Sequence, residues 1–161
     1  YYQTICRSTE QVGLGYISQL ADRNLAESLA VNRERDRILG YTSNGVHKDE
    51  LEMTLNEQLI RRAGSQGQNK TYLIALKLAQ FAFLTRKGQT TPILLLDDIF
   101  DKLDAARVAE IIKLVSGDSF GQIFITDTNR KYLDEILQAM NHDYALFRVE
   151  QGEVQPMEDQ P

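Results

Sequence analysis

A short aliphatic run that ends in two adjacent carboxylates, Ile93-Leu94-Leu95-Leu96-Asp97-Asp98, constrains this chain more than any other stretch. A run so apolar, opened by Thr91-Pro92, predicts a strand buried on both faces, as in a parallel sheet. In open α/β sheets, ligands bind at the carboxyl ends of the strands, where Asp97 and Asp98 fall. Two neighbouring carboxylates repel each other unless a cation is present, and Mg²⁺ carrying a nucleotide phosphate would supply that cation. An ordinary Asp-rich turn after a buried strand is the alternative.

The composition is that of an ordinary globular domain, with 161 residues, 42% of them hydrophobic and 25% charged. The net charge of −5 gives no overall attraction to nucleic acid, so any DNA contact must come from a local patch or from outside this stretch. Cys6 is the single cysteine, which excludes an internal disulfide and fits a reducing cytosol. The apolar run 72–84 is interrupted by Lys77 and is too short to span a bilayer. We expect a cytoplasmic protein without membrane association and, because the chain opens Tyr1-Tyr2-Gln3 without Met, an internal fragment of a longer one.

Local patterns predict the elements of the first 63 residues. Loose alternation predicts a strand over 12–17, and Asn24 is placed to cap a helix that Gly40 ends. Alternation over 51–62, with Asn56-Glu57 at its middle, predicts a hairpin whose second strand is 58–62.

The rest of the chain predicts alternating helices and strands. The segment 72–84 is apolar nearly all round, which predicts a helix buried on every side and ended by Gly88. Strand, helix, strand and helix over residues 92–140 form a βαβα unit, so we expect a parallel sheet with a crossover connection. The further elements are a helix capped by Asp104, a strand at 122–126, a helix with an apolar stripe over 132–140, and a closing hairpin around Gln151-Gly152.

The segment Gly64–Thr71 nearly matches a phosphate-binding loop, G-x-x-x-x-G-K-[ST], but the match fails on two points. Asn69 stands where the second glycine belongs, and its side chain obstructs close approach of the backbone. Such a loop also follows a buried strand, whereas the preceding residues are polar and include Arg61 and Arg62. We therefore reject that interpretation.

We interpret Ser65-Gln66-Gly67-Gln68 instead as a helix N-terminus that meets an anion. The free N–H groups and the positive end of the helix dipole favour phosphate there, the Ser65 hydroxyl adds a donor, and Gly67 lets the backbone come close. Plain N-capping by Ser65 is the alternative.

In combination these segments resemble the C-terminal half of an ABC-type ATPase, in the order signature motif, Walker B strand, D-loop and switch strand. Their amino-acid sequences are similar to those of the RecF family of DNA recombination-mediator proteins. The matching segments are Gly64–Thr71, Ala75–Gln80, Leu94–Phe100, Leu103-Asp104 and Gln122–Thr126. The resemblance covers roughly residues 41–150 and implies an α/β fold, a partial P-loop NTPase lobe with a parallel βαβα core. It divides the chain into 1–40, the helical end of a second (arm) lobe, and 41–161, the C-terminal half of the ATPase lobe.

The resemblance implies roles for the residues at the ends of the two strands. Asp97 is the expected Walker B ligand of Mg²⁺, through water, and Asp98 holds the place of the carboxylate that polarises the attacking water. Thr126 and Asp127 stand at the switch, where ABC transporters place a His after the Thr. The shorter Asp98 and the missing His argue against fast hydrolysis.

The resemblance also implies that two copies share each ATP. Ser65, Gln66, Gly67 and Gln68 are the expected signature residues, which contact the γ-phosphate of ATP held by the other subunit. Asp104 is the expected D-loop carboxylate at the dimer seam. No Walker A loop occurs in these 161 residues, so we expect the chain by itself to be inactive.

The implied function is that of a RecF-like, ATP-dependent DNA-binding protein in DNA replication, recombinational repair and the SOS response. The expected cofactors are ATP and Mg²⁺, and the expected partners are single-stranded DNA, its junctions with duplex DNA, and the RecO, RecR and RecA proteins. An ATP-driven dimer would clamp DNA at gaps, help to load the recombinase and be released by slow hydrolysis. Two alternatives stay open: the head of another SMC-like ATPase, and a non-catalytic interaction module that retains the fold. The pair Asp97-Asp98 argues against the module, since buried carboxylates without a ligand are costly.

Overall fold

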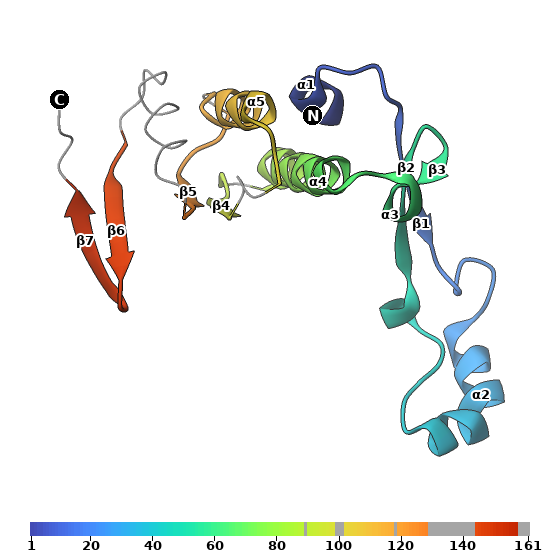
Figure 1. Ribbon diagram of the computed structural model, residues 1–161. Helices are drawn as coiled ribbons and strands as arrows, with labels where there is room; N and C mark the ends of the chain where they lie inside the picture. Colours follow the sequence, from blue (N-terminus) through green and yellow to red (C-terminus); the bar gives the residue numbers. More distant parts are fainter. Residues whose placement is uncertain (89, 99–101, 118, 129–143, 158–161) are drawn as a thin grey trace.

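The longest helix, α4 (Gln66–Lys87), lies at the centre of the computed structural model (Figure 1). Helices α1 (Tyr2–Cys6) and α5 (Ala105–Val115) lie along one side of α4, and strands β4 (Leu94–Asp97) and β5 (Ile123–Thr126) lie along another. The structure describes residues 1–88, 90–98, 102–117, 119–128 and 144–157.

The strands β4 and β5 form the predicted parallel pair. Leu94 lies opposite Ile123 and Asp97 opposite Thr126, so the two strands end at the same edge. Helix α5 connects them, which confirms the strand–helix–strand order and the α/β class. The helix predicted over 132–140 lies outside the described residues.

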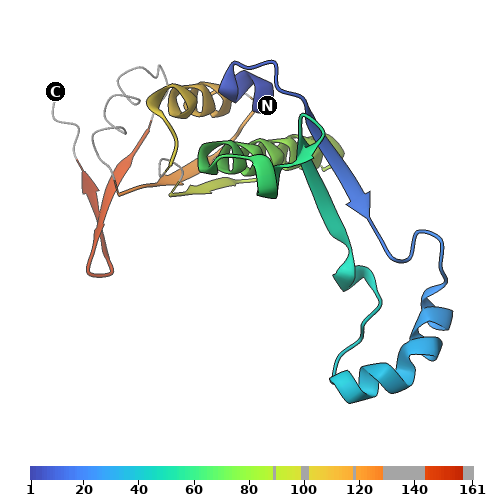
Figure 2. The same ribbon diagram turned by 45° about the vertical axis from the view of Figure 1, so that its right-hand side comes forward.

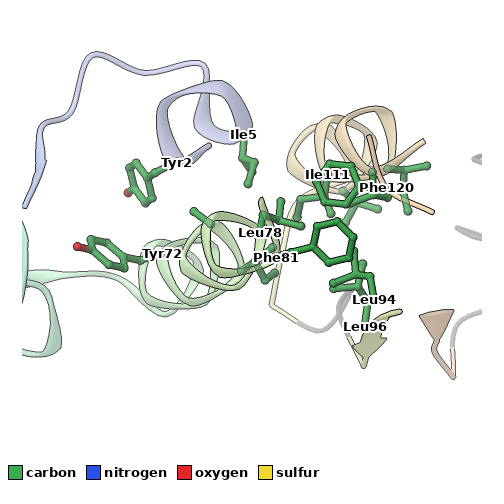
Figure 3. Packing of buried hydrophobic residues seen from close by; sticks show 14 of the residues in the cluster. Tyr2, Ile5, Tyr72, Leu78, Phe81, Leu94, Leu96, Ile111 and Phe120 are labelled. Carbon is green, nitrogen blue, oxygen red and sulfur yellow. The ribbon is translucent and has the colours of Figure 1, made fainter. Parts of the chain in front are cut away.

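The core is formed where one face of α4 meets α1, α5 and β4 (Figure 3). Leu78 of α4 and Ile111 of α5 are fully buried, and the ring of Phe81 stacks on that of Phe120 with 4.8 Å between centroids. Tyr2 and Tyr72 bring α1 onto the start of the same helix, with ring centroids 5.8 Å apart. Full burial of one such side chain contributes about 1.5–3 kcal/mol, so this cluster is the main source of stability.

Side-chain caps set where the two core helices begin, as predicted. Ser65 and Gln68 form a capping box at the start of α4, and Gly88 follows its last residue. The carboxylate of Asp104 accepts a hydrogen bond from the backbone N–H of Arg107 at 2.9 Å and so begins α5.

A long antiparallel ribbon of β1 (Val12–Ile17) and β2 (Glu50–Leu55) leads away from this body to helix α2 (Leu25–Leu39) (Figure 2). Asn24 caps α2 through its side chain, and Gly40 ends it in the left-handed conformation. No residue of α2 is buried, so its charged surface faces solvent along its whole length. A single turn of 3₁₀ helix, η1 (Val46–Lys48), precedes β2.

The predicted hairpin is present, but its second strand is shorter than expected. Asn56 and Glu57 turn the chain with φ angles of 48° and 65°, and β3 (Gln58–Leu59) pairs with the end of β2. The prediction of a strand through residue 62 is wrong, since α3 (Ile60–Ala63) follows at once. Ile60 explains the change, because it is buried at the start of α3 as part of the core.

Two predictions of burial are wrong for this structure. Leu73 and Phe83 of α4 are about half exposed, and Leu95 of β4 is 70% exposed, while Leu94 and Leu96 are buried. The reason is the layering: the helices contact only one face of the β4–β5 pair, so every second residue of β4 points to solvent.

The closing hairpin is confirmed as β6 (Leu146–Glu150) and β7 (Glu153–Met157), joined by Gln151 and Gly152. Both turn residues have positive φ, at 52° and 86°, as in the type I′ turns that connect two-residue hairpins. In Figure 1 this hairpin lies at the opposite end of the molecule from α2.

The predicted lobe boundary between residues 40 and 41 stays a prediction, and several contacts cross it. Helix α1 contacts α4 and α5, and β1 pairs with β2 along six residues. The side chain of Arg7 also forms an ion pair with Glu110 of α5. Among the described helices, none is both long and apolar enough to cross a membrane.

The base of the ribbon near α2 carries a pH-sensitive contact between Tyr16 and Asp49. The Tyr16 hydroxyl donates a hydrogen bond to the Asp49 carboxylate, which lowers the pKa of Asp49 below 3.8 and raises the pKa of Tyr16 above 10.0. The carboxylate form accepts this bond, so its stabilisation is present above the ordinary Asp pKa and is lost as the pH falls through the lowered one.

We therefore expect Tyr16→Phe to lower the melting temperature at neutral pH, and this difference from the parent chain to shrink as the pH falls through the lowered pKa of Asp49. On the alkaline side the difference should shrink again as the pH rises through the raised pKa of Tyr16. Melting curves of both chains across this pH range check the prediction. A difference that is the same at every pH would show that the contact contributes nothing.

Candidate functional site

The shared edge of β4 and β5 brings Asp97, Asp98 and Thr126 together. Asp97 lies opposite Thr126 in the parallel register, and the Thr126 hydroxyl donates a hydrogen bond to a carboxylate oxygen of Asp97. Asp127 follows at the end of β5, as the sequence requires. Carboxylate and hydroxyl oxygens are ligands that Mg²⁺ accepts, and this ion needs only one or two carboxylates beside water and phosphate. The donor set at this edge therefore fits Mg²⁺.

Both carboxylates are exposed to solvent, whereas the sequence pattern predicts that they are buried. The prediction that Asp97 and Asp98 require a cation rests on that burial. Because they are exposed, they need no cation to offset desolvation. The described residues also contain no cluster of three or more side chains that could hold a metal ion by themselves.

Asp98 has a backbone conformation that is uncommon for a residue with a side chain. Its φ angle is 48°, in the left-handed region. Its N–H donates to the carbonyl oxygen of Thr126 at 3.0 Å, and its own carbonyl accepts a hydrogen bond from Nζ of Lys70 at 2.6 Å. The backbone of Asp98 is thus held from both sides, by β5 and by α4.

The first turn of α4 is closed by the side chains of Ser65 and Gln68. The hydroxyl of Ser65 accepts a hydrogen bond from the Gln68 N–H at 3.2 Å, and Oε1 of Gln68 accepts one from the Ser65 N–H at 2.8 Å. The plain capping role considered for Ser65 is therefore confirmed. It leaves a role toward phosphate open, because Ser65 and Gln66 are exposed and the hydroxyl hydrogen is not used by the cap.

Gln68 is also held by a residue far away in the sequence. Its Nε2 donates to Oε1 of Glu10 at 2.7 Å, and the other oxygen of Glu10 accepts hydrogen bonds from the hydroxyls of Tyr2 and Ser8. Sequence reasoning did not find Glu10, because it lies in no motif and is 58 residues from its partner.

Gly67 faces the segment between β4 and α5. A Cβ atom at Gly67 would lie 2.7 Å from Nη1 of Arg107 and 3.4 Å from the carbonyl oxygen of Lys102. Arg107 is in turn near its own helix cap, with Nε 3.4 Å from the Asp104 carboxylate. The sequence predicts that the missing side chain of Gly67 lets a ligand come close, and in this structure the space is taken by the guanidinium group of Arg107.

The structure therefore brings the first turn of α4 beside the edge that carries the carboxylates. Lys70 contacts Asp98, and Gly67 lies against Arg107. Chemically, this surface combines the first turn of α4 and the cations Lys70 and Arg107 with the carboxylates at the end of β4, the groups that anions and divalent cations use.

Comparison with known proteins finds similar sequences and similar solved structures. No family model matches the chain. It is 81% identical over 159 residues to the DNA replication and repair protein RecF of Parabacteroides distasonis, covering 99% of this chain and 44% of that protein. It is 61% identical over 157 residues to the protein of the same name from Bacteroides thetaiotaomicron, covering 98% and 42%. The chain thus spans less than half the length of these curated relatives.

Solved structures agree in fold. The chain superimposes with a TM-score of 0.66 on the recombination mediator protein RecF-ATPrS in the RecFOR pathway, at 21% identity, covering 96% of this chain and 41% of that one. The RecF-ATP structure gives 0.62, also at 21% identity, covering 94% and 40%.

The capping box predicts the cost of changing Ser65. We expect Ser65→Ala to lower the free energy of unfolding by about 1 kcal/mol, because the N–H of Gln68 loses its acceptor. Ser65→Asn should retain most of the stability, since its side chain also accepts at this position. Urea denaturation of the three chains measures both effects, and an unchanged stability of Ser65→Ala would contradict the cap.

Proposed function

This chain belongs to the RecF family of DNA replication and repair proteins, and from that membership we propose that it forms the C-terminal part of an ATP-dependent DNA-binding protein. One observation carries the proposal: the first turn of α4 meets the carboxylate edge of β4 and β5, in a chain 81% identical to a RecF protein. The similar solved structures are of RecF-ATPrS and RecF-ATP, which supports ATP as the ligand.

The proposed roles follow the chemistry of each group. Asp97 and Thr126 would hold a Mg²⁺ ion, which would neutralise phosphate charge. Asp98 orients the attacking water and accepts its proton. Asp127 follows Thr126 at the end of the switch strand β5, at the position where ABC transporters have a His.

The signature role belongs to Ser65, Gln66, Gly67 and Gln68, which contact the γ-phosphate of ATP held by a second copy of the protein. The hydroxyl of Ser65 and the N–H groups of the first turn donate to that phosphate, and the dipole of α4 adds to the attraction. Asp104 lies at the seam between the copies.

We further propose that the full-length protein works in the cytoplasm as an ATP-dependent homodimer. It binds single-stranded DNA and its junctions with duplex DNA, and cooperates with RecO, RecR and RecA in replication, recombinational repair and the SOS response. The pathway named in one related structure supports these partners. The net charge of −5 favours DNA contacts outside this chain.

Two observations favour the non-catalytic interaction module as a second candidate. Asp97 and Asp98 are exposed, so their presence does not require a ligand, and both ends of the Gln68 amide are engaged within the chain. The measurements below separate the two candidates.

We expect Asp98→Asn to slow ATP turnover about 10²-fold or more while ATP binding is retained, because the attacking water loses its base. The assay uses a full-length chimaera in which this chain replaces the matching 159 residues of the Parabacteroides distasonis relative. Asp22→Asn, at an exposed Asp far from the edge, is the matched control and should keep the parent rate. Equal rates for Asp98→Asn and the parent would remove the catalytic role of Asp98.

The same chimaera tests the signature role through Ser65→Arg. The bulky cation would fill the space of the partner's γ-phosphate, so we expect binding of ATP by each monomer to persist and dimerisation with ATP to fail. Sedimentation with and without ATP measures this. Ser65→Ala, which loses both the cap and the hydroxyl donor but adds no bulk, separates these losses from the steric block. Dimers of Ser65→Arg that form normally with ATP would favour the interaction module.

A further inference from the structure

We infer that Lys70 is a positioning residue that holds the backbone of Asp98 and couples it to the first turn of α4. The inference rests on the proposed function, because it gives Asp98 and the α4 N-terminus their roles toward ATP. The contact that carries it is the hydrogen bond from Nζ of Lys70 to the carbonyl oxygen of Asp98, at 2.6 Å.

The conformation of Asp98 explains why such a contact matters. Left-handed backbone at a residue with a side chain is unfavourable and persists only where the surroundings hold it in place. Here Thr126 accepts from the Asp98 N–H at 3.0 Å, and Lys70 donates to the Asp98 carbonyl. Without the ammonium group, only the N–H side of Asp98 is fixed, and the direction of its side chain is free to change.

The position of Lys70 makes this contact a link between two parts of the site. Lys70 is the fifth residue of α4, about 7 Å along the helix axis from the cap at Ser65. These five residues make less than one and a half helical turns, and so short a stretch of helix moves as a unit. A displacement of the α4 N-terminus, such as contact with a phosphate imposes, is therefore passed through Lys70 to Asp98.

A second contact joins the first turn of α4 to the residues that follow β4. The guanidinium of Arg107 lies against Gly67 and is held near Asp104. The first turn of α4 is thus fixed to residues on both sides of the segment that joins β4 to α5. Of these two contacts, the one from Lys70 to Asp98 is a charge-assisted hydrogen bond, a type that is stronger than a hydrogen bond between neutral groups.

The consequence in a dimer is communication between two ATP sites. In the proposed arrangement, the α4 N-terminus of one copy contacts the ATP of the other copy, while Asp98 acts on the ATP of its own copy. Lys70 then lets one site sense that the other is occupied. It acts through Asp98 and does not itself touch the reacting atoms.

The experiment uses the full-length chimaera with Lys70→Met, which keeps the length of the side chain and removes the donor. We expect kcat to fall about tenfold or more, as loss of one charge-assisted hydrogen bond permits, while KM for ATP and dimerisation with ATP stay within about twofold. Lys70→Arg, which keeps a cationic donor, should restore most of the rate. Lys77→Met, at an exposed lysine of the same helix, is the matched control and should match the parent.

Melting temperatures of all variants separate positioning from folding, and Lys70→Ala replaces Lys70→Met if the latter does not fold. A kcat within twofold of the parent, or Lys70→Arg as slow as Lys70→Met at equal stability, would overturn the inference. A parent chimaera that shows no ATPase activity would overturn the proposed function instead, and with it the premise.

Discussion

Burial of one face of α4 is the interaction on which the rest of this structure depends. Leu78 and Phe81 bring α5, Phe120 and the inner face of β4 onto the helix, and Tyr72 brings α1. Each contact removes apolar surface from water, which is the largest favourable term in folding. Because these elements pack on one helix, the ends of that helix and of β4 are brought to fixed places relative to one another.

The polar contacts at the start of α4 depend on the position that the core gives this helix. Once the core fixes the helix, Lys70 reaches the Asp98 carbonyl, Gln68 reaches Glu10, and Arg107 lies over Gly67. None of these contacts has a large net energy, since each replaces hydrogen bonds to water. Their value lies in geometry, because they set the directions of groups that the proposed reaction needs to align.

Several large apolar side chains of the core elements are exposed on the faces that point away from the core. Leu95 and Phe124 on the outer face of β4 and β5, and Leu73 and Phe83 on α4, are at least half exposed. The sequence pattern of these elements predicts burial on all sides, whereas in this structure they are covered on one side only.

Much of the fold and of the candidate site was determined by the sequence itself. The caps Ser65 and Asp104, the glycine stop at Gly40 and the alternation of strands act over a few neighbouring residues, so their effects appear as local patterns. The motifs at residues 65–68 and at the ends of β4 and β5 are similar to those of the RecF family, and the chain belongs to that family.

Packing in three dimensions sets which of those residues come into contact. The bond between Lys70 and Asp98 joins residues 28 apart, and that between Glu10 and Gln68 joins residues 58 apart, and no periodic pattern marks either pair. The exposure of Asp97 and Asp98 was likewise invisible in an apolar run that predicted burial. The physical reason is that capping and amphipathicity depend on neighbours in the chain, whereas burial and long-range hydrogen bonds depend on which elements pack together in space.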